Sequence, residues 1–127
     1  MTIQLDHIIL AVNDPAESVE FYTRVLGFAD EGRDGPFAVA RVSPEFTLQL
    51  APWGTKGGEH LAFAMSKAEF DKTFQRLIAA GIAYGDRFDQ AGNMRGPGDE
   101  SGARGMGKAV YFFDPNQHLL EIRHYET

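Results

Sequence analysis

Four polar side chains in this 127-residue sequence have the types and the spacing of a metal-binding set. His7 and His60 each lie in the first strand-like segment of one half of the chain, and Gln49 and Glu121 each lie in the last. Two imidazoles and a carboxylate can hold a divalent metal while leaving coordination positions open. If the two halves close on each other, these side chains can converge, and a cation would then neutralise a buried Glu121.

The same residues also allow a plainer interpretation. A single histidine on an apolar strand is more often a hydrogen-bonded core residue than a ligand, and a buried carboxylate can be paired with a guanidinium. Arg123 and Arg24 are the candidate partners of Glu121. Spacing alone leaves both interpretations open.

Hydrophobic periodicity predicts two helices and six strands that would position these side chains. Asp14 and Ser66 are suited to cap the helices, and Gly27 and Gly81 are suited to end them. The predicted strands cover residues 3–12, 37–43, 46–51, 60–65, 107–113 and 118–125. Because successive side chains of a strand alternate in direction, Gln49, His60 and Glu121 fall opposite the bulky residues that would pack under the helices, whereas His7 interrupts an apolar face.

The order of strands and helices repeats, which indicates an internal duplication. His7 and His60 are 53 residues apart, whereas Gln49 and Glu121 are 72 residues apart. Most of the excess falls in residues 85–107, which contain seven glycines. We expect this segment to be a long mobile loop, acting either as a lid or as a solvated surface insertion.

Composition argues against several classes of function. The net charge of -6 and the pI near 5.1 argue against nucleic acid or an anionic membrane as partner. The sequence has no cysteine, which excludes disulfides and thiolate chemistry. The stretch MTIQLDHIIL has no basic segment and does not predict a signal peptide, and no uncharged run approaches the roughly 20 residues of a membrane span. We therefore expect a cytoplasmic protein.

Three stretches of the sequence, LDHIILAVNDPAESVEFYTRVLGF, EHLAFAM and YFFDPNQHLLEI, resemble the vicinal oxygen chelate superfamily. This superfamily includes glyoxalase I, bleomycin-resistance proteins, fosfomycin-resistance enzymes and extradiol dioxygenases. The resemblance covers nearly the whole chain and implies a single α+β domain. Two paired βαβββ modules, about 1–55 and 56–127, would form an open, cup-like mixed β-barrel. The resemblance also implies a homodimer.

The resemblance places His7, His60 and Glu121 on the family's metal-ligand positions, with Gln49 as a fourth or neighbouring ligand. It implies a divalent cofactor, which could be iron, manganese, nickel or zinc, and a small substrate that chelates it through two neighbouring oxygens. Tyr111 lies ten residues before Glu121, where relatives have a tyrosine that contacts substrate. A core aromatic is an equally good interpretation of Tyr111.

Further candidates for substrate contact lie outside the predicted metal set. Trp53 and Phe37 offer aromatic surface, and Arg104 could bring positive charge to an anionic substrate from the 85–107 loop. Charged loop residues are more often simply solvated.

Three departures from the family pattern bear on the reaction. Gln49 lies where glyoxalase I usually has a glutamate base, and an amide cannot take a proton at neutral pH, which disfavours glyoxalase I activity. Gly102, Ala103 and Arg104 occupy the region where extradiol enzymes have a histidine. Gln117 replaces the usual glycine of the D-P-x-G turn and predicts a different or strained turn. Oxygen-dependent cleavage, thiol transfer and isomerisation all stay open.

A binding module is the main alternative to an enzyme. Bleomycin-resistance relatives sequester a drug without metal or catalysis, and Trp53, Phe37, Phe46 and Tyr111 could line such a groove. A regulatory relative with a degenerate site is a third possibility. The full set of metal-position residues favours the enzyme, because a pure binder has no need of them.

Overall fold

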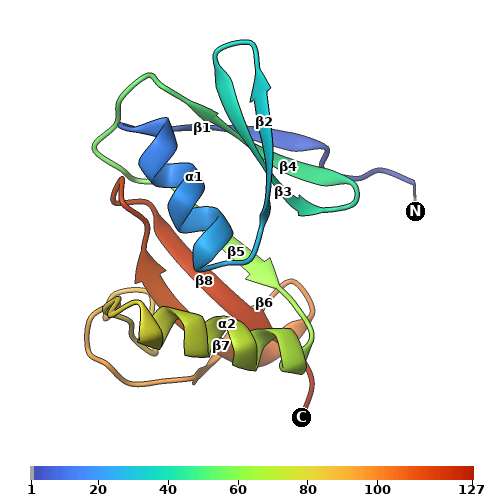
Figure 1. The fold of residues 1–127 in the computed structure, drawn as a ribbon. Coiled ribbons are helices and arrows are strands. Elements are labelled where there is room, and N and C mark those ends of the chain that lie inside the picture. Colours follow the sequence, from blue (N-terminus) through green and yellow to red (C-terminus); the bar gives the residue numbers. More distant parts are fainter. Residues whose placement is uncertain (1) are drawn as a thin grey trace. The chain divides into compact units, whose positions relative to one another are not determined.

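The structure is a computed structural model that describes residues 2–127. The chain divides into two compact units, Met1–Lys56 and Gly57–Thr127, which we call module 1 and module 2 (Figure 1). Met1, where the expected first module begins, lies outside the described residues. Each module contains one helix and one four-stranded sheet.

Module 1 has the order strand, helix and three strands. Its elements are β1 (His7–Ala11), α1 (Pro15–Arg24), β2 (Ala29–Asp34), β3 (Phe37–Ser43) and β4 (Phe46–Ala51). The strands lie in the order β1-β4-β3-β2, with β1 parallel to β4 and the other neighbours antiparallel.

Module 2 repeats this topology. Its elements are β5 (His60–Ala64), α2 (Lys67–Ala79), β6 (Gly98–Gly102), β7 (Gly105–Phe113) and β8 (Leu119–His124). The strand order is β5-β8-β7-β6, and β5 is again parallel to the last strand of its module. The predicted α+β class with two βαβββ modules is therefore confirmed.

Both helices begin at the predicted capping residues. The Asp14 carboxylate accepts hydrogen bonds from the backbone N–H groups of Ala16 at 3.1 Å and Glu17 at 3.4 Å. The Ser66 hydroxyl accepts one from Glu69 at 3.1 Å. These bonds satisfy N–H groups that have no partner inside the helix, and so they fix where each helix starts.

Two strands of the structure have no counterpart in the prediction, and both lie at the edge of a sheet. The sequence of β2 is ADEGRD and every residue is exposed, while β6 has the sequence GDESG. An edge strand that buries neither face needs no apolar alternation, so the pattern that reveals the other strands is missing. Backbone pairing with β3 and β7 holds them in place.

The strand β6 corrects the expectation of a continuous loop over residues 85–107. Residues 98–102 pair with residues 105–109 of β7, so that only residues 103 and 104 lie between the two paired segments. The first predicted strand is also shorter than expected, because β1 begins at His7 and not at residue 3. The D-P-x-G departure is confirmed as an unusual turn, since Gln117 has a left-handed φ of 69°.

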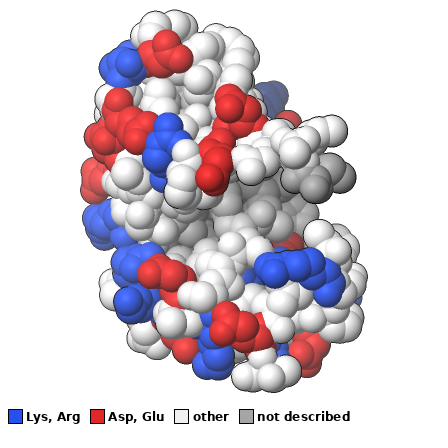
Figure 2. Space-filling model, turned by 90° about the vertical axis from the view of Figure 1, so that its right-hand side faces the viewer, with Lys and Arg blue, Asp and Glu red and all other residues white. Residues whose placement is uncertain are grey.

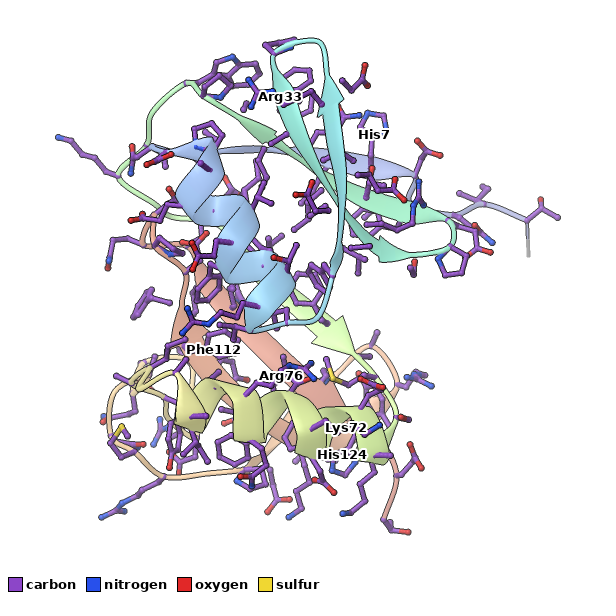
Figure 3. The ribbon with its side chains drawn as sticks, in the orientation of Figure 1. His7, Arg33, Lys72, Arg76, Phe112 and His124 are labelled. Carbon is purple, nitrogen blue, oxygen red and sulfur yellow. The ribbon has the colours of Figure 1, made fainter. Side chains whose placement is uncertain are left out.

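In each module the helix covers one face of the sheet and forms the core with it. The fully buried side chains of module 1 include Leu10, Leu48, Leu50 and Tyr22. Those of module 2 include Phe112, Leu120, Ile122, Phe70 and Leu77. His124 lies on the same side of the sheet as Phe112 (Figure 3). Its ring packs against Phe70 of α2, with the two ring centroids 4.8 Å apart.

None of the helices in the described part of the chain is long and apolar enough to cross a membrane. On the face shown in Figure 2, the described Lys and Arg side chains are interspersed with Asp and Glu side chains.

Candidate functional site

Strand register in module 2 gathers several predicted site residues on the face of the sheet away from α2. Glu121 of β8 is paired with Tyr111 of β7 on one side and with Ala62 of β5 on the other. His60 lies two residues before Ala62 and therefore points to the same face. Because directly paired residues project to the same side of a sheet, Tyr111 lies beside Glu121.

A direct side-chain contact in this group joins His60 and Glu121. The imidazole Nε2 lies 3.1 Å from the carboxylate Oε1. The histidine side chain is 46% exposed and the glutamate side chain is 6% exposed, so a half-exposed imidazole borders a buried carboxylate.

These two donor atoms fit two ligand positions of a divalent metal. Imidazole nitrogen and carboxylate oxygen each bind zinc at about 2.1 Å, and the tetrahedral geometry of zinc places two such ligand atoms roughly 3.4 Å apart. The observed 3.1 Å between His60 Nε2 and Glu121 Oε1 is close to that separation. A cation could therefore replace the shared proton with little movement of either side chain.

The burial of Glu121 has a second explanation, which the sequence raised as its plainer interpretation. Arg123 Nη1 donates to the other carboxylate oxygen, Oε2, at 2.6 Å, and the Arg123 side chain is 4% exposed. The other candidate partner, Arg24, pairs with Glu20 of its own helix. The guanidinium thus supplies a counter-charge at Oε2 and leaves Oε1 facing His60.

Tyr111 places an aromatic ring beside His60 and Glu121. It is 4% exposed, and its ring centroid lies 6.0 Å from that of His60. Burial, and after it the negative charge of Glu121, raises the pKa of the Tyr111 phenol to about 12. Tyr111 is therefore a neutral phenol over the whole physiological pH range, and it can donate a hydrogen bond but cannot act as a base.

The raised pKa of Tyr111 predicts a loss of stability in alkali. Between about pH 10 and 12 the unfolded chain releases the phenol proton and the folded protein retains it, so the free energy of unfolding falls as pH rises through this window. The Tyr111→Phe variant should show a smaller fall. Urea denaturation at about pH 9 and about pH 11.5 measures both slopes, and equal slopes in the two proteins would contradict the prediction.

Module 1 places its two predicted ligands on one face of its own sheet. Gln49 is paired with Ile9, and His7, two residues before Ile9, lies on the same side, away from α1 (Figure 3). His7 Nδ1 lies 2.7 Å from Asp6 Oδ2, and Gln49 Nε2 donates to Asp34 Oδ2 at 3.4 Å. A carboxylate on Nδ1 orients an imidazole so that Nε2 is free to bind a metal.

Within residues 2–127 no three His, Asp or Glu side chains lie together in a group that could hold a metal ion. The structure brings His60 and Glu121 together in module 2, and it places His7 and Gln49 in module 1. The complete four-residue set stays a prediction.

The predicted substrate contacts also divide between the modules. In module 1, Phe37 and Trp53 form an edge-to-face pair with ring centroids 5.9 Å apart, and Trp53 is 64% exposed. In module 2, Arg104 lies in the turn between β6 and β7, with its guanidinium 4.3 Å from the centroid of the Tyr125 ring. A contact of Arg104 with substrate stays a prediction.

The comparisons with known proteins agree with this fold. A sequence profile described as the Glyoxalase/Bleomycin resistance protein/Dioxygenase superfamily matches residues 4–122. The chain belongs to this superfamily. The resemblance that three stretches of the sequence indicated is thereby confirmed.

Several members of the superfamily resemble the chain over nearly its full length. The solved structure of Oxidase ChaP-H2 is 31% identical, with a TM-score of 0.81, and the match covers 99% of this chain and 96% of that one. Metallothiol transferase FosB of Lysinibacillus sphaericus is 27% identical over 96% of this chain and 83% of its own. Glutathione transferase FosA of Serratia marcescens is 26% identical over 96% and 81%.

One residue of the site was not among the predicted site residues. Arg123 entered the sequence interpretation only as a possible partner for Glu121, yet it is the most buried charged side chain in the group. Its position gave a usable signal, because a residue two places after Glu121 on the same strand must share its face.

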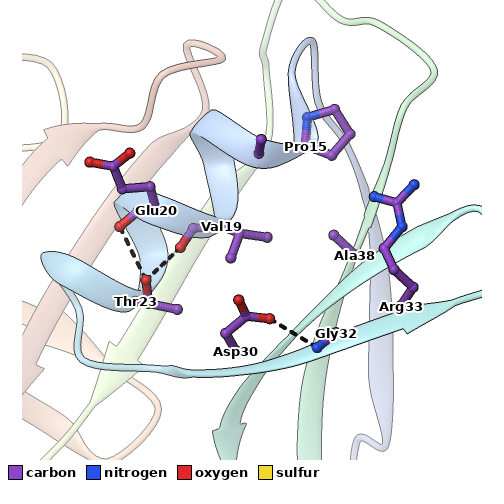
Figure 4. A pocket seen from close by; sticks show the side chains of 9 residues that line it. Pro15, Val19, Glu20, Thr23, Asp30, Gly32, Arg33 and Ala38 are labelled. Atoms are coloured by element: carbon purple, nitrogen blue, oxygen red, sulfur yellow. Dashed lines mark hydrogen bonds between the residues drawn. The ribbon is translucent and has the colours of Figure 1, made fainter.

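A separate groove of about 400 Å³ lies on the helix side of the module 1 sheet, between α1 and β2–β3 (Figure 4). Thr23 and Asp30 line it, but Thr23 Oγ1 donates to the carbonyl of Val19, and Asp30 accepts from the N–H of Gly32. Ala38 in this groove is paired with Leu50, which belongs to the helix-facing side. The groove is therefore on the opposite face of the sheet from the predicted ligands of module 1.

Proposed function

We propose that this chain is a divalent-metal-dependent enzyme of the superfamily that acts on a small oxygenated substrate. His60 and Glu121 would hold the metal in module 2, His7 would be the third ligand, and Gln49 a fourth or neighbouring one. The observation that carries this proposal is the 3.1 Å approach of His60 Nε2 to Glu121 Oε1 beside Tyr111. The similarity to FosB, a metallothiol transferase, supports a metal.

The chemistry divides between the metal and the protein. The bound ion would offer open positions to two neighbouring substrate oxygens and stabilise negative charge on them. Tyr111 would donate a hydrogen bond to the substrate, because its pKa of about 12 keeps it protonated. Arg123 would supply a fixed positive charge at Oε2 of Glu121 and leave Oε1 for the metal.

The side chains of the candidate site narrow the range of possible reactions. Isomerisation of the glyoxalase I type needs a strong enough base, and neither the Gln49 amide nor the Tyr111 phenol can take a proton at neutral pH. We therefore favour thiol transfer, or an oxygen-dependent reaction that does not use the histidine of extradiol enzymes, because the relatives include transferases and an oxidase. A thiol would have to come from solution, since the chain has no cysteine.

A ligand-binding module without a metal is the second candidate. The exposed edge-to-face pair of Phe37 and Trp53 favours it, because aromatic side chains supply flat apolar surface for a drug-sized ligand. Chelation with EDTA would leave ligand binding unchanged in a binding module, and it would abolish the binding of a substrate that chelates the metal.

Metal content gives the first test of the enzyme hypothesis. Protein purified anaerobically and without a histidine tag should contain nearly one equivalent of iron, manganese, nickel or zinc by mass spectrometry. The His60→Ala variant should lose this metal. Removal of a residue that only supports a ligand lowers metal affinity about 10–100-fold, and removal of a direct ligand should lower it further. The matched control is Glu59→Ala, which removes the exposed carboxylate next to His60 and should retain the metal.

The outcomes separate the candidate functions. If the wild-type protein takes up no metal even after anaerobic reconstitution, the enzyme hypothesis is wrong and the binding module becomes the better proposal. If His60→Ala keeps a full equivalent with unchanged affinity, the metal lies elsewhere.

A further inference from the structure

One arginine spans three strands of module 2. Arg123 belongs to β8, yet its Nη2 donates to the carbonyl of Glu100 at 2.9 Å and its Nη1 to the carbonyl of Ser101 at 3.2 Å, both in β6. The same Nη1 lies 2.6 Å from Glu121 Oε2. Because β7 lies between β6 and β8, the side chain must cross β7 to make these contacts.

The sequence leaves room for this crossing by using the smallest residues. A Cβ on Gly102 would overlap the Tyr125 hydroxyl and lie 2.5 Å from Arg123 Cζ. A Cβ on Gly107 would lie 2.5 Å from the carbonyl oxygen of His124 and 3.0 Å from Arg123 Nη2. Ala109 is the residue of β7 that pairs directly with Arg123, and it is completely buried. The ring of Tyr125 packs against the guanidinium at 4.7 Å. These two glycines, which are typical of a loop in the sequence, therefore leave space for the side chains of Arg123 and Tyr125.

Stability alone does not account for this arrangement. Arg123 is 3% exposed, and burying an ion pair generally gains no more than a well-packed hydrophobic side chain of similar volume. In the described residues its Nε–H has no hydrogen-bond acceptor, which adds a further cost. Costs of this kind are typical of side chains that fix the geometry of a site.

The contacts of Arg123 define that geometry. Its hydrogen bond to Oε2 uses one oxygen of Glu121 and restricts the rotation of the carboxylate, so that Oε1 faces His60 Nε2 at 3.1 Å. The two bonds to carbonyl oxygens of β6 fix the guanidinium from the other side. Movement of the β6–β7 hairpin would therefore move the carboxylate.

We propose that Arg123 is a positioning residue that aims Glu121 Oε1 at the His60 side of the sheet and couples the β6–β7 hairpin to that carboxylate. The effect on the metal rests on the function proposed above, whereas the coupling of the hairpin does not. Such coupling is reciprocal. If an ordered hairpin raises metal affinity by some factor, metal binding should raise the protection of the hairpin amides against hydrogen exchange by the same factor.

The metal arm of the test compares Arg123→Gln and Arg123→Lys with wild type. Lysine keeps the positive charge but offers a single ammonium, which cannot hold Glu121 and two carbonyls in the planar arrangement of a guanidinium. We expect both variants to bind Mn²⁺ about 10–100-fold more weakly, as measured from the electron paramagnetic resonance signal of the free ion. If the arginine acted only through its charge, Arg123→Gln would bind Mn²⁺ more tightly and Arg123→Lys would bind it like wild type.

The matched control for this arm is Arg41→Gln in module 1. Arg41 also pairs with a carboxylate, Glu31 at 2.7 Å, and also donates to two carbonyl oxygens, those of Ser43 and Pro44. It has no contact with a predicted ligand in the described structure, so its loss should leave Mn²⁺ affinity unchanged.

The hairpin arm measures amide hydrogen exchange by mass spectrometry without metal. In Arg123→Gln and Arg123→Lys, the amide protection of peptides that cover β6 should fall about tenfold relative to wild type. The protection of peptides from β3 in module 1 should stay unchanged. If Arg123→Gln fails to fold, Gly102→Ala provides a second variant, because it retains the arginine and its methyl group would overlap both the guanidinium and the Tyr125 hydroxyl. Gly92→Ala is its control, since a Cβ there meets nothing within 4 Å.

The Mn²⁺ measurement and the hydrogen-exchange measurement test different parts of the proposal. Unchanged β6 protection in all Arg123 variants and in Gly102→Ala would overturn the coupling, whatever the metal result. Lost protection with Mn²⁺ affinity equal to or above that of wild type would reduce Arg123 to a structural role. If wild-type protein binds no Mn²⁺, the positioning of a metal ligand falls together with the proposed function, and the hairpin arm still decides the coupling.

Discussion

Glu121→Ala should lower the free energy of unfolding by about 3–5 kcal/mol, the largest effect that we expect from a single substitution in the site. The substitution removes the carboxylate that lies 2.6 Å from Arg123 Nη1 and leaves a guanidinium that is 4% exposed without its counter-charge. Removing one partner of a buried ion pair costs far more than the pair contributes, because the remaining charge stays desolvated.

Urea denaturation of metal-free protein measures this loss, and an exposed ion pair gives the matched control. Glu31→Ala breaks the pair with Arg41, in which both side chains are more than a third exposed, so water screens the freed charge and the loss should be much smaller. The double variant Glu121→Ala/Arg123→Met removes both charges and should recover part of the loss. A Glu121→Ala protein as stable as Glu31→Ala would show that Arg123 is adequately solvated.

Asp114→Ala should be the second most damaging change, with a loss of roughly 2–4 kcal/mol. The Asp114 carboxylate is 3% exposed and accepts hydrogen bonds from Asn116 N at 2.8 Å, His118 N at 2.9 Å and Asn116 Nδ2 at 3.0 Å. All three donors are buried, so the substitution leaves them without the acceptor that compensates their desolvation. The turn they form joins β7 to β8 and so sets the register that pairs Tyr111 with Glu121.

The size of this effect can be checked with two further variants. Asp114→Asn keeps an oxygen that can accept from the two backbone N–H groups, and we expect it to lose less than half as much stability as Asp114→Ala. Asp89→Ala removes an exposed loop carboxylate that pairs with Arg87 at 3.4 Å and should change stability little. Equal losses in Asp114→Ala and Asp89→Ala would mean that the turn keeps its shape without the aspartate.

The sequence was sufficient to predict the elements whose side chains are sorted by burial. Strands β3 and β4 have the predicted bounds, and both helices start after the predicted capping residues Asp14 and Ser66. Alternation also placed His60 and Glu121 on the face away from the helix, because a strand with one buried side fixes the direction of every residue in it.

The sequence could not reveal features that depend on backbone pairing or on one long side chain. The edge strands β2 and β6 are polar, and only hydrogen bonds to β3 and β7 define them. The role of Gly102 and Gly107 depends on where the Arg123 guanidinium ends, four bonds or more from its own backbone. No periodicity in the sequence carries that information, so a glycine-rich stretch predicted a loop instead of a hairpin.

The place of the chain's one tryptophan has an optical consequence. Trp53 is 64% exposed and belongs to module 1, where it contacts Phe37 at the start of β3. Its fluorescence emission therefore samples the solvent and the aromatic neighbour on that module. A ligand that reaches the Phe37–Trp53 pair will change the emission directly, whereas module 2, which holds His60 and Glu121, contains no such fluorophore. A change in Trp53 emission during a titration therefore reports an occupant of the Phe37–Trp53 pair.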